Sequence, residues 1–386
     1  MIENIPIPME EKTSPSPPLA PKGSGRLALV LSGGGIPGWA YEIGCLAAMD
    51  DFFDGFSVND FDIYVGTSAG AAVAALMANN IRPIHIYHDI LRNRKTAANF
   101  SRRDIYSFAY WEMLHSIKKL FLSLYPIAKH YLGHRGPFSL LELWEWIEES
   151  LPSGIYSMRN YDRYLSRFLS QPGLTNDFRA LKKELYIPAV DLDIGRYDIF
   201  GEPGWDDIPI SRAVIASSAI PIFFEPVEIR NRYYIDGGVG RVAYMDIAIN
   251  HGAELIWVID PVQYFVNDGK ARLRSYSGKP VSIKEKGYAF IYDQAMRINS
   301  NTRIYFATKR YRLEYPEKSF LLIQPKLSEG AIFPPSPVGF SRRTEMMQYG
   351  YTSTCEFLRE QFSSYEGTLK KFGIRVTMKK FKTPKK

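Results

Sequence analysis

The sequence contains little cysteine. Cys45 and Cys355 are the two cysteines among 386 residues, and neither belongs to a Cys-x-x-Cys or Cys/His pair. Two distant cysteines do not make a disulfide framework, and their spacing does not fit a zinc site. The sequence therefore predicts a reducing compartment and no metal centre.

Long hydrophobic runs are also missing. No stretch of about 18 uncharged apolar residues is available to cross a bilayer. Residues 1–25 are rich in proline and serine and lack the apolar centre of a secretory signal. We expect this segment to be a disordered arm. We expect the protein to be cytoplasmic, with a peripheral position on a membrane as an option.

Nucleic-acid motifs are missing as well, since no zinc-knuckle, RNP or basic-zipper pattern occurs. The formal net charge is +7, from 48 basic and 41 acidic residues. This mild excess suits an anionic membrane surface better than a nucleic acid. Hydrophobic residues make up 46% and aromatic residues 14% of the chain, which permits a large core and an apolar ligand. The oligomeric state is left open.

A serine motif follows one of the apolar runs. Ile63–Val65 is typical of a buried strand, Gly66-Thr67-Ser68-Ala69-Gly70 comes next, and a helix-forming run begins at Ala71. This order is typical of a nucleophile elbow, in which a tight turn presents the serine hydroxyl. The helix N-terminus beneath it would favour the negative charge that develops in acyl transfer. The alternative is a plain glycine-rich loop.

A glycine loop follows the first apolar run in the same way. Arg26–Ser32 predicts a strand, Gly33-Gly34-Gly35-Ile36-Pro37-Gly38 a turn, and Trp39–Phe53 a helix. Amides at such a turn bind an anion, which is either a nucleotide phosphate or the oxyanion of a tetrahedral intermediate. A P-loop motif is absent, and the acidic residue of a dinucleotide site, about 20 residues on, has no clear candidate. We favour the oxyanion because the serine motif follows on the next strand.

Strands and helices alternate along the chain. This pattern predicts an α/β fold with a central, mostly parallel sheet flanked by helices. In such a sheet the two turns open at the same carboxyl edge, which places Ser68 beside Gly33 and Gly35. Further strands are expected at residues 185–193, 197–200 and 255–260, a hairpin at 227–235 with its turn near Asn231, and helices near 282–302 and 342–362.

The motifs together resemble those of the patatin-like phospholipases. In chain order they are Gly33–Gly38, Gly66–Gly70, Ala216–Phe224 with its Ala-Ser-Ser-Ala-Ile-Pro run, and Tyr234–Gly238 with its Asp-Gly-Gly. The resemblance covers about residues 26–262. It implies a three-layer α/β/α fold and hydrolysis of lipid esters, of the phospholipase A or lysophospholipase type. It also implies that the chemistry needs neither calcium nor another cofactor.

The resemblance implies a catalytic dyad of Ser68 and Asp236. Ser68 would be the nucleophile and Asp236 the base, with burial raising the pKa of its carboxyl. The implied oxyanion donors are the amides of Gly33, Gly34, Gly35 and Ala69. The remaining motif glycines are Gly38, Gly66, Gly70, Gly237 and Gly238.

Pro37 departs from the family pattern. The family loop usually carries an arginine at this position, and a proline has neither the positive charge nor a backbone N–H. A catalytically weak or inactive lipid-binding protein with this fold is therefore the second hypothesis. A triacylglycerol lipase or esterase is a further alternative.

A serine–histidine–aspartate triad is the rival mechanism. The order Ser68, Asp236, His251 matches that of α/β-hydrolases. His251, however, stands where a helix should end before a strand, and the other histidines all fall between residues 85 and 134.

Residues 26–369 are expected to form one domain with a helical, lid-like insert at about residues 80–180. Within the insert, apolar residues recur at helical spacing from Tyr110 to Leu124, with Lys118 and Lys119 on the other side. This pattern suits either an interfacial helix on anionic lipid or an ordinary lid or core helix with a solvated face. Residues 370–386, with eight basic residues and no acidic one, are expected to be a basic tail.

Overall fold

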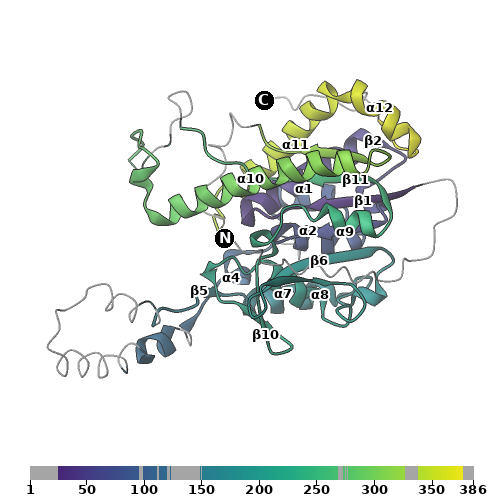
Figure 1. The fold of residues 1–386 in the computed structure, drawn as a ribbon. Coiled ribbons are helices and arrows are strands. Elements are labelled where there is room, and N and C mark those ends of the chain that lie inside the picture. Colours follow the sequence, from purple (N-terminus) through teal and green to yellow (C-terminus); the bar gives the residue numbers. More distant parts are fainter. Residues whose placement is uncertain are drawn as a thin grey trace, which may run out of the picture.

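The computed structural model is a three-layer α/β/α structure, with helices on both faces of a central sheet (Figure 1). This confirms the expected fold class. The structure describes residues 25–94, 99–110, 113–119, 122, 148, 150–267, 273, 275, 277–326 and 338–376. The predicted disordered arm lies outside the described residues except for Gly25.

Within these described residues the central sheet has eight strands in the order β12-β11-β1-β3-β6-β10-β9, with β7 also pairing to β6. From β12 to β6 neighbouring strands are parallel, whereas β7 and β10 are antiparallel to β6, and β9 to β10. The strands are β1 (Arg26–Leu31), β3 (Ile63–Gly66), β6 (Glu184–Asp191), β7 (Arg196–Phe200), β9 (Val227–Ile229), β10 (Arg232–Ile235), β11 (Ala253–Ile259) and β12 (Ser319–Ile323).

Alternate residues of each strand face opposite sides of the sheet. In β1, Leu29 and Leu31 belong to the core on one face, and Ala28 and Val30 to the core on the other. Because both faces are covered, the parallel strands read as continuous apolar runs. The first face is covered by α1 (Gly35–Phe52), α2 (Ala69–Ala78), α3 (Pro83–Leu91), α8 (Ile210–Ser217) and α11 (Arg343–Glu360), and the second by α9 (Met245–Asn250) and α10 (Tyr288–Glu314).

Two glycines allow α11 to pack closely on α1. A Cβ added to Gly44 would lie 2.0 Å from the carbonyl oxygen of Met347, and one added to Gly350 would lie 2.2 Å from that of Tyr41. The backbones therefore touch, which a larger residue at either position would prevent. Through this contact the C-terminal part of the chain packs on the helix that follows the glycine loop.

The predicted hairpin at residues 227–235 is confirmed. Strands β9 and β10 pair in antiparallel fashion around Arg230 and Asn231, which have φ values of 52° and 63°. Two central residues with positive φ are typical of a type I′ hairpin turn. The hairpin carries the chain to Asp236 at the end of β10.

The insert is not helical throughout. Besides α3 it contributes α4 (Arg102–Ile105) and α7 (Arg159–Leu169), but β4 (Ser107–Phe108) and β5 (Gly154–Ser157) join β8 (Ile222–Phe224) in a three-stranded sheet. A Cβ on Gly154 would lie 2.2 Å from the backbone nitrogen of Glu225, so glycine permits this pairing. Strands of two to four residues are too short to show the alternation of apolar and polar residues that indicates a strand, so the sequence did not predict them. Residues 113–119 are helical, as the apolar spacing suggested.

The predicted basic tail begins inside the folded domain. Helix α12 (Phe362–Lys371) is followed by β13 (Arg375–Val376), which pairs antiparallel with β2 (Phe53–Asp54). Ile374 is buried. The domain therefore extends to Val376, and the remainder of the expected tail lies outside the described residues.

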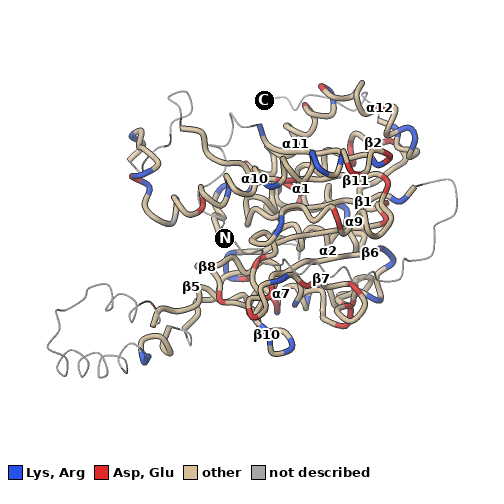
Figure 2. Tube along the Cα trace, viewed as in Figure 1, with Lys and Arg blue, Asp and Glu red and all other residues tan. Residues whose placement is uncertain are grey.

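Charged residues are spread over the helices and loops, whereas the central strands β1 and β11 carry one each, Arg26 and Glu254 (Figure 2). In the part of the chain that the structure describes, no helix combines the length and the apolar character needed to span a bilayer. Short 3-10 helices occupy Val58–Asp60, Phe178–Ala180, Gly237–Val239 and Lys284–Lys286.

Candidate active site

Ser68 lies at the turn between β3 and α2. Its backbone has φ 55° and ψ −126°, a conformation that costs a residue with a side chain about 1–3 kcal/mol. The turn is tight, because a Cβ on Gly66 would lie 2.5 Å from the carbonyl oxygen of Gly70. One on Gly70 would lie 2.5 Å from that of Leu31 in the neighbouring strand. Both glycines are needed for the strand and the helix to meet at this angle.

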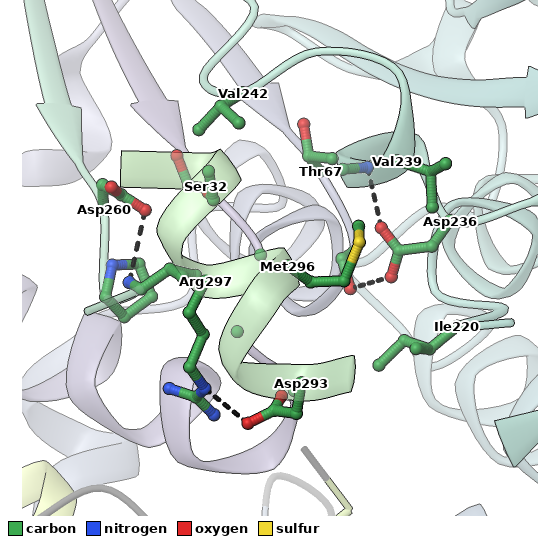
Figure 3. Close-up of a pocket in the computed structure, with 18 of the residues that line it drawn as sticks. Ser32, Thr67, Ile220, Asp236, Val239, Val242, Asp260, Asp293, Met296 and Arg297 are labelled. Atoms are coloured by element: carbon green, nitrogen blue, oxygen red, sulfur yellow. Dashed lines mark hydrogen bonds and ion pairs between the residues drawn. The ribbon is translucent and has the colours of Figure 1, made fainter. Parts of the chain in front are cut away.

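Asp236 reaches Ser68 from across β6, which lies between β3 and β10 in the sheet. It follows β10, which is antiparallel to β6 and whose last residue, Ile235, pairs with Val190 near the carboxyl end of β6. The Ser68 hydroxyl donates to Asp236 Oδ2 at 2.5 Å, and the Gly238 N–H donates to Asp236 Oδ1 at 2.8 Å (Figure 3). A Cβ on Gly237 would lie 2.4 Å from the carbonyl oxygen of Pro188, so this glycine permits the approach.

The Asp236 carboxyl is buried, and desolvation raises its pKa to about 6. The hydrogen bonds from Ser68 and Gly238 lower the pKa in part and do not cancel this effect. A carboxylate with a pKa near 6 remains ionised at neutral pH and accepts a proton more readily than an ordinary aspartate. The expectation that burial raises the pKa of this carboxyl is therefore confirmed.

The glycine loop lies directly against Ser68. A Cβ on Gly33 would lie 2.7 Å from the Cβ of Ser68. Gly34 is the N-cap of α1 with φ 149°, and Gly35 begins the helix with φ 62°. Amides in the first turn of a helix have no intrahelical acceptor, and the dipole there favours negative charge. Ala69 begins α2 in the same way.

A cavity of about 140 Å³ opens over Ser68 and Asp236. The glycine loop and the residues after Asp236 form part of its wall, and α10 contributes Tyr292, Met296 and Arg297. Met296 points from α10 toward Asp236, and Arg297 pairs with Asp293 (Figure 3). The sequence predicted a helix here but not its place in the wall.

A family model for patatin-like phospholipases matches residues 29–249. This is more than half of the chain, and it includes the glycine loop, Ser68 and Asp236. The chain belongs to the patatin-like phospholipase family.

Individual relatives are distant. The probable lipid hydrolase 463L of Invertebrate iridescent virus 6 is 23% identical over 229 residues, which cover 58% of this chain and 63% of 463L. The uncharacterized protein YqhO of Bacillus subtilis (strain 168) is 25% identical over 224 residues, which cover 54% of this chain and 62% of YqhO. The chain therefore spans less than two thirds of the length of these curated relatives. Among solved structures, VipD from Legionella pneumophila aligns at 15% identity with a TM-score of 0.37, over 88% of this chain and 67% of VipD.

Ser217 is a site residue whose role the sequence did not reveal. Its hydroxyl accepts the Ser68 backbone N–H at 3.0 Å and donates to the carbonyl oxygen of Pro188 at 2.6 Å. The buried Ser217 side chain thus links the patatin elbow to β6. The Ala-Ser-Ser-Ala-Ile-Pro run was the available signal, but the contact spans 149 residues of sequence.

Pro37 is the third residue of α1 and is buried. Proline is tolerated in the first turn of a helix because an N–H there would have no intrahelical acceptor. It removes one amide of the patatin loop but leaves those of Gly34, Gly35 and Ile36. The departure from the family pattern therefore does not disrupt the local fold.

His251 lies at the opposite edge of the sheet from Ser68. It follows α9 just before β11 begins, and Arg26, at the start of β1, donates to its carbonyl oxygen at 2.7 Å. Its ring stacks on Tyr186 and lies 3.8 Å from Glu184. Since Ser68 follows the carboxyl end of β3, the triad alternative is excluded for His251.

Two further buried carboxyls flank this patatin-like site. Asp260 follows β11, lines the cavity, and has its pKa raised to about 7 by desolvation. Glu42 in α1 is fully buried. Desolvation, and to a smaller extent the nearby charge of Asp260, raise the pKa of its carboxyl well above the usual range. The sequence did not single out either residue. Among the described residues no cluster of acidic, histidine and cysteine side chains could hold a metal ion.

Proposed function

We propose that the protein is a serine acyl-ester hydrolase acting on lipid, of the phospholipase A or lysophospholipase type. The observation that carries this proposal is the 2.5 Å hydrogen bond from the Ser68 hydroxyl to Asp236. The family, the strained serine turn and the adjacent glycine loop support it.

In the first step Ser68 Oγ attacks the ester carbonyl carbon, and its proton passes to Asp236. The amides of Gly33, Gly34, Gly35 and Ala69 stabilise the oxyanion that forms. The bond between the carbonyl carbon and the alcohol oxygen then breaks, and the departing oxygen takes the proton from Asp236. An acyl group remains on Ser68.

In the second step water replaces the alcohol. Asp236 accepts a proton from the water as its oxygen attacks the acyl carbonyl. The Ser68–acyl bond breaks, Ser68 recovers the proton, and a fatty acid leaves. Each proton transfer is assigned to Ser68 and Asp236, and the mechanism uses no cofactor.

The proposed substrate is a phospholipid or another lipid ester at a membrane surface. The exposed apolar residues Tyr110, Leu114 and Ile117 of the insert support this proposal, because they face solvent rather than the core. An apolar helix face that is not packed suits the interface of a bilayer, where the neighbouring lysines would meet anionic lipid. The interfacial interpretation is therefore favoured over that of a core helix.

A lipid-binding protein that turns over slowly or not at all is the second candidate. Pro37 favours it, because the loop has one amide fewer and lacks the arginine charge of the family pattern. If the proposed action at a membrane is wrong, a triacylglycerol or a simple ester becomes the candidate substrate in place of a phospholipid.

The test is hydrolysis of p-nitrophenyl esters from acetate to palmitate by wild type, Ser68→Ala and Asp236→Asn. The proposal expects turnover by wild type above both variants on at least one ester. Wild-type turnover no greater than that of Ser68→Ala, with liposome binding retained, would favour the lipid-binding candidate. Mass spectrometry of lipid extracts treated with wild type or Ser68→Ala would then separate phospholipid from triacylglycerol substrates.

A further inference from the structure

A second cavity, of about 50 Å³, meets the larger one at Ser68. We propose that this smaller cavity binds the acyl chain of the substrate and that the larger one binds the alcohol that leaves. The inference rests on the proposed ester hydrolysis and adds the orientation of the ester, that is, which of its two parts enters which cavity. It assigns an aliphatic acyl chain of limited length to the smaller cavity.

Among the residues that the structure describes, Gly35, Ser68 and Ile220 line both cavities. An ester carbonyl held between Ser68 and the glycine loop therefore has one cavity on each side. Because the acyl chain and the alcohol diverge from the carbonyl carbon, they can occupy different cavities. What remains is to decide which part enters which cavity.

Asp236 distinguishes the two cavities. It lines the larger cavity and does not belong to the wall that the described residues form around the smaller one. When the tetrahedral intermediate collapses, the alcohol oxygen must receive the proton that Asp236 holds, which requires a separation of about 3 Å. The alcohol therefore lies on the Asp236 side, and the acyl chain lies on the other.

The smaller cavity has the apolar wall that an acyl chain needs. Trp39 of α1 meets Phe100 edge to face, with ring centroids 4.7 Å apart, and the ring of Tyr161 in α7 lies 6.4 Å from that of Phe100. Ile105 of α4 and Phe224 of β8 are buried in the same wall. None of the described lining residues is charged, whereas the larger cavity contains carboxylates and guanidinium groups.

Much of this wall comes from the insert, which contributes Phe100, Ile105, Met158 and Tyr161. The insert therefore shapes the acyl site in addition to any role at the membrane. Each methylene that enters an apolar site improves transition-state binding, which raises kcat/KM about fourfold. The packed aromatic rings limit the depth, so the gain should stop at a defined chain length.

Substitutions at Ile105 test this assignment in both directions. Ile105→Phe should fill the cavity and shorten the acyl chain of the best p-nitrophenyl ester. Ile105→Ala should enlarge it and lengthen that chain by about two carbons. Met158→Ala, on another part of the wall, should also lengthen it and serves as a second enlarged variant if Ile105→Ala does not fold.

Met296→Ala is the matched control, because Met296 lines the larger cavity alone. It should leave the acyl-length profile unchanged and alter the preference among butyrate esters of different alcohols. The opposite pattern, in which Met296→Ala changes the acyl-length profile and the Ile105 variants do not, would overturn the assignment.

A binding arm separates failure of this inference from failure of the proposed function. If wild type hydrolyses no ester above Ser68→Ala, the proposed function fails, and binding of fatty acids with four to sixteen carbons is measured by titration calorimetry. If the fatty acid that binds most tightly is shorter for Ile105→Phe and longer for Ile105→Ala than for wild type, the acyl site is still supported. If the length of the best-bound fatty acid is the same in both variants and in wild type, the acyl site is contradicted.

Discussion

Asp236 and Asp260 lie at the same cavity and differ in what they contact. Each follows a strand, each is buried, and each lines the larger cavity. Asp236 accepts a hydrogen bond from the Ser68 hydroxyl at 2.5 Å, whereas Asp260 accepts one from the Gln324 side chain at 2.9 Å. One carboxyl therefore faces a nucleophile and the other faces an amide.

Burial affects both carboxyls in the same direction. Desolvation raises the pKa of Asp236 to about 6 and that of Asp260 to about 7. The pKa alone would therefore rank Asp260 as the more perturbed group. Contact with Ser68, and not the size of the pKa shift, identifies Asp236 as the candidate base.

The largest expected difference between these carboxyls is in turnover. Asp236→Asn should lower kcat/KM about a thousandfold, because an amide cannot accept the Ser68 proton. Asp260→Asn keeps the shape and places no change next to Ser68, so it should lower kcat/KM less than about threefold. Initial rates with a p-nitrophenyl ester measure both effects. Similar losses in the two variants would abolish the distinction drawn between these residues.

The pH dependence of turnover should follow Asp236 alone. With a pKa of about 6, the base is ionised above this pH, and kcat/KM should fall about tenfold per unit below it. The inflection near pH 6 should persist in Asp260→Asn and in Glu42→Gln. An inflection that moves in either variant would mean that the other carboxyls govern the rate.

Turnover by Ser68 and Asp236 should also depend on Ser217, which holds the serine turn through its hydrogen bonds. Ser217→Ala removes the acceptor of the Ser68 N–H and the donor to Pro188, which leaves two buried backbone groups without this partner. We expect a loss of about 1–3 kcal/mol in the free energy of unfolding and a roughly tenfold drop in kcat, with KM little changed.

Ser218→Ala is the matched control for Ser217→Ala. The Ser218 hydroxyl is buried and has no hydrogen-bond partner among the described residues. Its removal should change the free energy of unfolding by less than about 1 kcal/mol. Equal effects of the two substitutions would contradict the role assigned to Ser217. Chemical denaturation and ester kinetics provide the two measurements.

The smallest expected effect is on the pH dependence of stability, and it concerns Glu42, whose carboxyl lies near Asp260. Burial raises the pKa of Glu42, so folded protein keeps its proton to a higher pH than the unfolded chain does. Stability contributed by this group is therefore present below the unfolded pKa and is lost as pH rises above it. Glu42→Gln removes this loss, so its stability relative to wild type should improve from pH 5 to pH 8.

Urea denaturation of Glu42→Gln at both pH values measures this change. Asp54→Asn, at an exposed position, is the control and should show no such trend. A relative stability that stays constant or decreases for Glu42→Gln would show that Glu42 ionises as readily in the folded protein as in the unfolded chain.

The sequence predicted the elements that depend on local patterns. Ile63–Ala72 carried both the apolar run and the glycines of the turn, and Asn231 indicated the hairpin that ends at Asp236. Contacts between distant segments were not predictable in this way. The contact of Gly350 with the Tyr41 backbone joins helices about 300 residues apart, and the hydroxyl of Ser217 reaches Ser68 across 149 residues.

The acid pair of Glu42 and Asp260 was missed for a related reason. Glu42 lies in a helix that is mostly apolar apart from Asp50 and Asp51 near its end, and from the sequence alone a single glutamate there is compatible with an exposed position. Its burial depends on tertiary packing, because α11 packs along α1 and Asp260, which follows β11, lies near its carboxyl. Composition and periodicity do not report such tertiary burial.

Labelling of Ser68 tests the central claim most directly. An alkyl fluorophosphonate forms a phosphorus–oxygen bond with an activated serine and releases fluoride, and the adduct is located by mass spectrometry of peptides. We expect one adduct per chain, on Ser68, in wild type and in Asp260→Asn, much slower labelling in Asp236→Asn, and none in Ser68→Ala. An unlabelled wild type, or an adduct on another residue, would contradict the assignment of Ser68 as a nucleophile activated by Asp236.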